Sequence, residues 1–157
     1  MIAQLLNRLT NTDPSELMSS QLFDESDFYD AFLKDLAKCQ QEVILESPFA
    51  TNKRVSLLLP MLEKLKNRGV RIIISTRDPE EHDNYLCDEA RRSLSVLQHL
   101  GIHVIYTENC HRKLAILDRN ILWEGSLNIL SQCRSKEVMR RTKSTSLAWQ
   151  MTRFVGL

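Results

Sequence analysis

No apolar run in this chain approaches the roughly eighteen residues that a membrane-spanning helix needs. The first twenty residues, MIAQLLNRLTNTDPSELMSS, also lack the basic-then-apolar order of a signal peptide. The four cysteines are scattered and include no Cys-x-x-Cys pair, which argues against a disulfide framework and against a zinc knuckle. The sequence therefore predicts a cytoplasmic protein with reduced thiols and no stable membrane insertion.

The composition is that of an ordinary globular protein, with 43% hydrophobic and 26% charged residues. The length of 157 residues is enough for one hydrophobic core, so we expect a single domain over residues 1–157. Short helical patterns near the start predict an N-terminal helical extension at 1–22.

The formal net charge of +1 conceals an uneven distribution of charge along the chain. Residues 109–157 hold nine Lys or Arg against three Asp or Glu, whereas residues 1–108 hold twelve against seventeen. A cationic segment of this kind favours a polyanionic substrate, although a run of charge is often only a solvated surface. Both interpretations stay open at this point.

Helical and strand-like patterns alternate along the chain. Apolar residues recur at helical spacing over 27–40, 52–68 and 84–100, and a strand-like run follows each segment, at 42–47, 70–75 and 102–106. Gly69 and Gly101 stand at two of these junctions, where a glycine ends the helix. A strand near 136–141 and a closing helix near 145–154 complete the pattern. We therefore expect an α/β fold, a mixed β-sheet flanked by helices on both faces.

One stretch, HRKLAILDRNILWEGSLNILS at 111–131, concentrates the side chains suited to chemistry. It carries the pattern H-x-K-x4-D-x6-G-S-x-N, namely His111, Lys113, Asp118, Gly125, Ser126 and Asn128. Two apolar runs flank the turn-forming residues 118–120, which predicts a β-hairpin. Because side chains alternate along a strand, His111 and Lys113 are expected to share a face and to converge on one phosphate. Asp118 is expected to order the turn or to pair with a cation such as Arg119.

The end of this stretch carries three further expectations. Gly125 suits either a close backbone approach or a positive φ. Ser126 is expected either to begin a helix as its N-cap or to donate a hydrogen bond to a phosphate. Asn128 would then lie in the first turn of that helix.

The spacing resembles the signature of the phospholipase D superfamily, known as the HKD motif. All of its fixed positions agree without a gap, and accident would produce this agreement with a probability on the order of one in ten thousand or below. The resemblance implies a phospholipase D-like half that dimerises, with its motif region at 111–137. It implies no cofactor and no metal ion.

In that superfamily a histidine attacks the phosphorus of a phosphodiester, and a covalent phosphohistidine forms before a second histidine and water complete hydrolysis. The resemblance implies that His111 is the nucleophile and, in the partner copy, the general acid. It also implies that Lys113 and Asn128 bind the non-bridging phosphate oxygens. Asp118 completes the catalytic set, and Glu137 stands where relatives often have an acidic residue that orients the histidine. Further substrate contacts are expected from residues of the same stretch, namely Arg112, Arg119, Gly125 and Ser126.

The chain has one H-x-K sequence, whereas the reaction of this superfamily uses two. The resemblance therefore predicts a homodimer in which the motifs of two copies complete one active site. Together with the cationic segment, it favours a metal-independent endonuclease on DNA or RNA. Two alternatives stay open: a phospholipase D or phosphatidyl-transfer enzyme, and a non-catalytic nucleic-acid-binding module of a helicase or restriction system.

Overall fold

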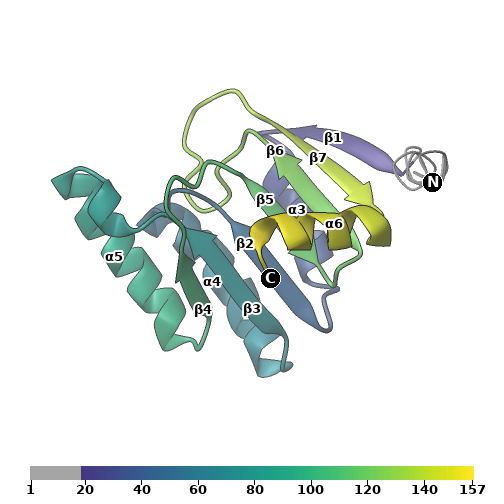
Figure 1. The fold of residues 1–157 in the computed structure, drawn as a ribbon, viewed down its shortest axis with the longest axis horizontal. Coiled ribbons are helices and arrows are strands. Elements are labelled where there is room, and N and C mark those ends of the chain that lie inside the picture. Colours follow the sequence, from purple (N-terminus) through teal and green to yellow (C-terminus); the bar gives the residue numbers. More distant parts are fainter. Residues whose placement is uncertain (1–18) are drawn as a thin grey trace, which may run out of the picture.

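The computed structural model describes residues 19–157 as one seven-stranded sheet with helices on it (Figure 1). The strands are β1 (Ser20–Asp24), β2 (Glu42–Glu46), β3 (Arg71–Thr76), β4 (His103–Tyr106), β5 (Leu114–Leu117), β6 (Ile121–Gly125) and β7 (Val138–Lys143). Their order across the sheet is β1-β7-β6-β5-β2-β3-β4. The strands β2, β3 and β4 are parallel and the other neighbouring pairs are antiparallel, so the sheet is mixed, as predicted.

Helices cover both faces of this sheet. Within the described range they are α3 (Phe28–Leu36), α4 (Asn52–Asn67), α5 (Asn84–His99) and α6 (Thr145–Val155), with the short 3-10 helix η1 (Pro79–Glu81) before α5. Figure 1 shows α6 crossing in front of the strands, with α3 and α4 behind them. This arrangement confirms the predicted fold class. No helix within residues 19–157 is long and apolar enough to cross a bilayer.

The buried strand β2 shows how the sequence produces two cores. Every residue of β2 is buried, and successive side chains point to opposite faces of the sheet. Val43 and Leu45 join the larger core, which includes residues of α3, α4 and α5. Ile44 joins the smaller core, in which Ala148 of α6 packs with Ile116. The continuous apolar run of this strand is therefore explained by helices on both sides.

Two helix–glycine–strand junctions have the predicted form. Gly69 has φ +82° and Gly101 has φ +75°, and each follows the C-cap residue of a helix. Val70 then donates its N–H back to the carbonyl of Leu65, which closes the end of α4. A glycine adopts this left-handed conformation without a Cβ penalty, so the chain can turn at once into the next strand.

The expected helical extension at 1–22 is wrong for its last residues. Ser20–Asp24 form β1, which pairs antiparallel with β7 in the register Ser20↔Thr142. The backbone groups of this segment are satisfied by a strand more than a hundred residues away, so the local pattern did not decide its conformation. Residues 1–18 of the expected extension lie outside the described residues.

Candidate active site

Several chain segments meet at one edge of the sheet. The parallel strand β2 ends there, β5 begins there and β6 ends there, as the paired positions Glu46↔Leu114 and Leu114↔Glu124 show. Gly125, the last residue of β6, pairs with Met139 near the start of β7. Loops that follow the carboxyl ends of parallel strands commonly form ligand sites in α/β proteins.

The strands β5 and β6 form the predicted hairpin. Asn120 donates its N–H to the carbonyl of Leu117 at 3.0 Å, and the two residues between them, Asp118 and Arg119, both have φ +49°. Two successive residues with positive φ form a type I′ turn, whose twist matches the twist of the strands that it joins. The turn therefore fixes the register that brings Lys113 beside Gly125 at the other end, where Gly125 N–H donates to the Lys113 carbonyl at 3.2 Å.

His111 and Lys113 lie at this open end of the hairpin. The paired segment begins at Leu114, so both residues precede β5 rather than lie within it. The side chain of His111 is exposed, and Lys113 Nζ donates to the His111 carbonyl at 2.6 Å. The imidazole and the ammonium group therefore belong to one edge of the molecule, outside the core.

Arg77 joins this group, although the sequence pattern did not single it out. It directly follows β3, and its Nη2 lies 2.5 Å from His111 Nε2 and 3.4 Å from Nδ1. Its Nε donates to the carbonyl of Cys110 at 2.9 Å. The guanidinium carbon lies 5.6 Å from the ring centroid of Phe49, which stacks on His82 at 4.9 Å. The available signal was an arginine placed directly after a buried parallel strand.

The environment of His82 follows from this arrangement. Burial, together with the positive charge of Arg77, lowers the pKa of His82. Its ring thus favours the neutral form that stacks on Phe49. Among residues 19–157, no group of three or more His, Cys, Asp or Glu side chains lies in position to hold a metal ion.

Gly125 and Ser126 lie where β6 meets β7. A Cβ at Gly125 would overlap the carbonyl of Val138 and come within 2.8 Å of Met139 Sδ, so the predicted close backbone approach is confirmed. The alternative of a positive φ is wrong. Ser126 begins no helix, because its N–H donates to the Val138 carbonyl at 3.0 Å and its Oγ accepts from Val138 N–H at 3.1 Å. Pairing with β7 therefore replaces the expected N-cap.

Asn128 lies in the loop between β6 and β7, where no helix follows, but its carbonyl accepts the N–H groups of Ser131 at 3.0 Å and Gln132 at 2.8 Å in a single turn. Tyr29 fixes this loop by donating its hydroxyl to the Ile129 carbonyl at 2.8 Å, and Arg54 Nε donates to the Gln132 carbonyl at 2.5 Å. Burial, opposed by the charge of Arg54, raises the pKa of Tyr29, so its hydroxyl stays a donor. Asn128 Oδ1 is buried and has no hydrogen-bond partner among the described residues. An unpaired buried acceptor lowers the free energy of unfolding by about 1–3 kcal/mol, so a stabilising role does not explain the position of this amide.

Arg112 borders the site, but its charge is compensated within the chain. Its Nε lies 2.7 Å from Oε1 of Glu46, a carboxylate with no exposed surface, and its Nη1 donates to the Phe154 carbonyl at 2.9 Å. Cys110 Sγ donates to the same Glu46 oxygen at 3.2 Å. Burial and this hydrogen bond raise the pKa of Cys110 to about 12, so the thiol stays protonated. Arg112 therefore holds the buried Glu46 whatever further contact it makes.

The structure does not bring Asp118 and Arg119 together with His111. They form the turn at the opposite end of the hairpin, about 15 Å along β5 from Lys113. The carboxylate of Asp118 accepts the N–H groups of residues 40, 41 and 42, each at 2.9 Å, so it orders the turn and its surroundings. Arg119 pairs with Glu42 at 2.8 Å rather than with Asp118, and its guanidinium carbon lies 4.3 Å from the Trp149 ring centroid.

Glu137 lies in the same loop as Asn128, just before β7. Its Oε1 accepts from Ser135 Oγ at 2.5 Å, and its N–H donates to Glu25 Oε2 at 3.0 Å. Within the described part of the chain it makes no hydrogen bond with His111. The contact expected to orient the imidazole is therefore not made within one copy, and Arg77 lies beside the imidazole instead.

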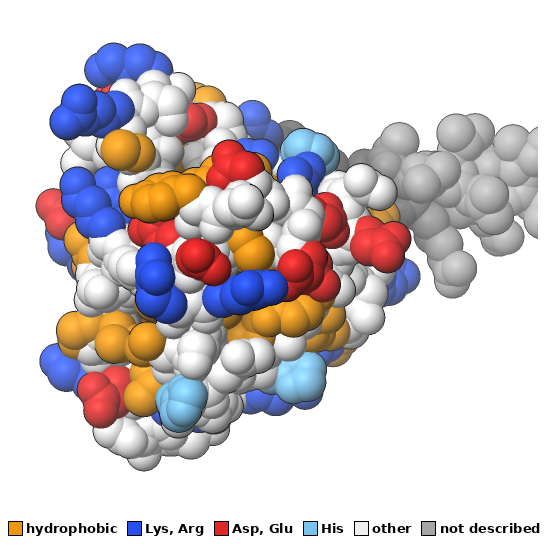
Figure 2. All heavy atoms as spheres, turned by 90° about the vertical axis from the view of Figure 1, so that its left-hand side faces the viewer, with side chains coloured by type: hydrophobic (Ala, Val, Ile, Leu, Met, Phe, Trp, Pro, Cys, Tyr) orange, Lys and Arg blue, Asp and Glu red, His pale blue; other side chains and the backbone are white. Residues whose placement is uncertain are grey.

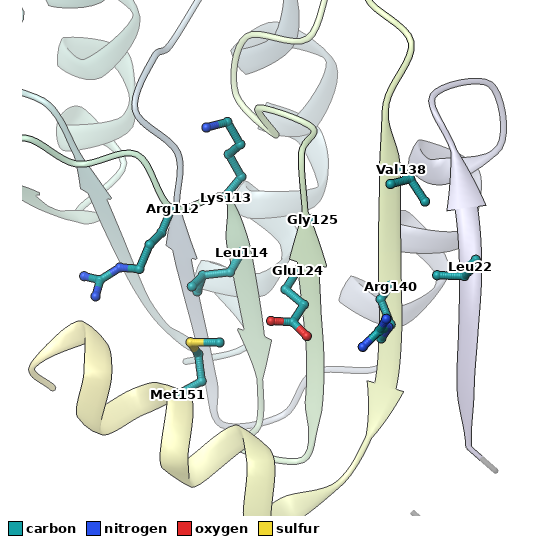
Figure 3. Close-up of a pocket in the computed structure, with 9 residues that line it drawn as sticks. All are labelled: Leu22, Arg112, Lys113, Leu114, Glu124, Gly125, Val138, Arg140 and Met151. Atoms are coloured by element: carbon teal, nitrogen blue, oxygen red, sulfur yellow. The ribbon is translucent and has the colours of Figure 1, made fainter. Parts of the chain in front are cut away.

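A hollow of about 380 Å³ extends from Lys113 along the open part of the sheet face (Figure 3). Its lining includes Glu124 and Arg140, a cross-strand pair of β6 and β7, and the exposed Leu22 of β1. Figure 3 shows Lys113 extending away from Glu124, while Arg112 turns in another direction. The site therefore continues onto the sheet surface beside α6.

The surface around α5 is different in character. Figure 2 shows acidic, basic and apolar side chains interspersed on this side of the molecule. Arg91 forms ion pairs with Glu80 and Asp88 here, and Tyr85 is 74% exposed. A surface with both signs of charge interspersed provides no extended field for a polyanion.

Comparison with known proteins relates this arrangement to one family. The model of the family described as "cardiolipin synthase, PLD-like domain" matches residues 32–155. The fold is similar to that of Nuc from Salmonella typhimurium, a phospholipase D family member, with a TM-score of 0.71 and 16% identity over 87% of this chain and 90% of that chain. NucT from Helicobacter pylori has a TM-score of 0.65 and 16% identity over 86% of this chain and 91% of that chain.

A third similar structure is TrmBL2, an archaeal chromatin protein described with a novel mode of DNA binding. Its TM-score is 0.60 at 14% identity, over 97% of this chain and 55% of that chain. No curated protein matches the sequence. At these identities the structural likenesses show a shared fold.

Proposed function

This chain belongs to the phospholipase D superfamily, and from that premise we propose that it is a metal-independent phosphodiesterase, an endonuclease on DNA or RNA. The observation that carries the proposal is the position of His111 and Lys113 at one sheet edge, with Lys113 Nζ 2.6 Å from the His111 carbonyl and the imidazole exposed. Asn128, with its unpaired buried Oδ1, follows Gly125 in the adjoining loop.

His111 supplies the nucleophile of the proposed reaction. A ring nitrogen bonds to phosphorus while the bond from phosphorus to the leaving oxygen breaks, and a second imidazole gives its proton to that oxygen. A water oxygen then bonds to phosphorus, the nitrogen–phosphorus bond breaks, and a proton of the water returns to the second imidazole. Lys113 and Asn128 contact the non-bridging oxygens, where charge is held during both displacements.

The second imidazole comes from a second copy of the chain. The sequence contains no other H-x-K, and His82, His99 and His103 lie outside the motif. A twofold axis that passes beside His111 brings the same residue from each subunit to one phosphate. The chain aligns with 90% of the length of Nuc, so the two chains are comparable in size.

Nucleic acid is the substrate that the charge distribution favours. Residues 109–157 carry a threefold excess of basic over acidic residues, and the motif lies within them. TrmBL2, a protein of similar fold, is described as binding DNA, and this likeness equally supports the alternative of a binding module without turnover. The family description names cardiolipin synthase, which supports the lipid alternative.

Cleavage assays with His111→Asn test the reaction. We expect the wild-type chain to cleave DNA, RNA or bis(p-nitrophenyl) phosphate with EDTA present, and the variant to lose at least about a thousandfold of that activity while staying folded. His103→Asn is the matched control, because His103 is an exposed histidine on the edge strand β4. Cleavage that needs Mg²⁺, or that survives in His111→Asn, contradicts the proposal.

Subunit mixing tests the shared site. If each site needs His111 from two copies, exchange of wild-type chains with inactive His111→Asn chains leaves activity proportional to the square of the wild-type fraction. Sites contained in single chains give a linear dependence. Sedimentation of the same mixtures shows whether the copies associate.

Salt and substrate choice separate the alternatives. Binding of nucleic acid weakens steeply as salt rises, because the protein releases condensed counterions from phosphates. A lipid enzyme instead hydrolyses phosphatidyl substrates in vesicles and responds to their headgroup. A binding module retains DNA in a salt-dependent manner and releases no product.

A further inference from the structure

The cations of the described residues fall into two groups. Five arginines of residues 19–157 are paired with a carboxylate, among them Arg112 with Glu46 and Arg141 with Asp35. Arg77 makes no ion pair within residues 19–157, and its hydrogen-bond partners are a carbonyl and the imidazole of His111. Its positive charge is therefore not compensated by a neighbouring anion.

The position of Arg77 is nevertheless well defined. Its Nε is held by the Cys110 carbonyl at 2.9 Å, and its guanidinium lies over Phe49, which stacks on His82. These contacts restrict the side chain and leave the Nη2 group directed at the ring of His111. An uncompensated guanidinium kept in place beside a nucleophile is suited to an anionic ligand.

The contact with His111 places a positive charge beside the proposed nucleophile. Arg77 Nη2 lies 2.5 Å from Nε2 and 3.4 Å from Nδ1 of the same ring, so the guanidinium lies against the imidazole. A guanidinium has donors and no acceptor, so a phosphate oxygen that approaches this ring meets a hydrogen-bond donor. Arg77 is therefore placed to contact a phosphate that approaches His111.

We propose that Arg77 is a further catalytic residue, whose guanidinium moves from its contact with the His111 ring onto a non-bridging oxygen of the phosphodiester when substrate binds. This inference rests on the proposed phosphodiesterase function. The incoming phosphate offers the guanidinium a charged acceptor in place of a neutral one, so exchange of partners is favourable. The same movement frees the imidazole to form its bond to phosphorus, and no proton is transferred by Arg77.

The experiment compares Arg77→Ala and Arg77→Lys with Arg71→Ala in the full chain. Arg71 is the matched control, because it lies at the other end of the same strand and pairs with Glu42. We expect Arg77→Ala to raise the KM for a diester and to lower kcat/KM by about tenfold to a hundredfold. Arg77→Lys should recover part of this loss, and added guanidinium ion should recover part of it in Arg77→Ala. Arg71→Ala should leave kcat/KM unchanged.

A second measurement does not depend on turnover. Inorganic phosphate is titrated into each protein, and the resonances of the His111 ring are followed by NMR. We expect Arg77→Ala to weaken phosphate binding by about tenfold or more, while the folded spectrum is retained. If the wild-type chain cleaves no diester, this loss still supports the anion contact and the proposed function alone fails.

Three results overturn the inference. The first is a value of kcat/KM in Arg77→Ala within twofold of wild type, together with unchanged phosphate affinity. The second is an increase in kcat/KM, which would make Arg77 only an obstruction. The third is failure of both lysine and guanidinium ion to recover activity in folded variants, which would assign Arg77 to structure alone.

Discussion

The two ends of the β5–β6 hairpin carry similar residue types with opposite surroundings. At the turn end, Asp118 accepts three backbone N–H groups and Arg119 pairs with Glu42, so these charges are compensated inside the molecule. At the open end, Lys113 and Arg77 make no ion pair among residues 19–157, and their side-chain hydrogen bonds are to a carbonyl or an imidazole.

The difference shows which members of a cationic cluster are available to a substrate. A paired arginine must lose a carboxylate before it binds a phosphate, and the buried carboxylate is then left without a partner, which is costly. An unpaired lysine or arginine incurs no such cost. The excess of basic residues in the sequence favours a polyanion, but it does not show which of these residues bind it until the ion pairs are known. Substitutions at the open end should affect activity, and those at the turn end should affect stability.

After His111→Asn, the largest expected effect comes from Lys113→Ala. We expect kcat/KM to fall by about 10²–10³, because a cation aimed at the non-bridging oxygens is removed, while the midpoint of thermal unfolding stays the same. Lys143→Ala is the matched control, since Lys143 is an exposed lysine at the turn end, paired in register with Ile121. An equal loss of activity in both variants would mean that general positive charge, rather than the position of Lys113, matters.

At the turn end, Asp118→Ala should lower the free energy of unfolding by about 2–4 kcal/mol, because three N–H groups lose their acceptor and alanine is strained at φ +49°. Asp118→Asn keeps one acceptor oxygen and tolerates this φ, so its cost should be about half as large. Urea denaturation measures both. The folded fraction should retain the wild-type kcat/KM. A fall in the kcat/KM of fully folded protein would instead indicate that Asp118 takes part in catalysis.

These two ends also show what the sequence could and could not predict. The hairpin, its turn and the place of His111 and Lys113 follow from apolar periodicity and turn residues, which are local information. Arg77 reaches His111 across 34 positions of sequence, because β3 and β5 flank β2 in the sheet. A rule about residue spacing within one segment cannot predict this contact.

The errors have the same origin. Serine is a common N-cap residue, but the N–H and the Oγ of Ser126 are both hydrogen-bonded to the backbone of Val138 in β7. This strand belongs to a later part of the chain. The strand β1 was missed because its partner is β7 as well. Tertiary pairing overrides local preference wherever a free strand edge is available.

Gly125→Ala should disturb the open end through the backbone. The new methyl group would overlap the Val138 carbonyl and crowd Met139, so β6 and β7 must separate locally, at a cost of about 1–3 kcal/mol. Activity should fall as well, because Gly125 N–H fixes the Lys113 carbonyl. Gly69→Ala is the matched control: its added methyl meets no atom within 4 Å, and it should cost about 1 kcal/mol from its positive φ alone, with activity unchanged.

The smallest effect concerns the pH dependence of the turn end. Burial favours the neutral acid of Glu42, but hydrogen bonds and charges of Arg119 and Arg71 outweigh it, so the pKa of Glu42 lies below its ordinary 4.5. A carboxyl whose folded pKa is lowered stabilises the protein above its unfolded pKa, and this contribution disappears as the pH falls through the folded pKa.

We therefore expect the difference in unfolding free energy between wild type and Glu42→Gln to shrink as the pH falls below the ordinary pKa of a glutamate. Urea denaturation at several pH values measures it. Asp24 and Glu25 also have lowered pKa values, but they are present in both proteins and cancel in the difference. If the difference in unfolding free energy grows on acidification, the two arginines do not hold Glu42 ionised. The ion pair with Glu42 would then no longer distinguish Arg119 from the unpaired Arg77 and Lys113.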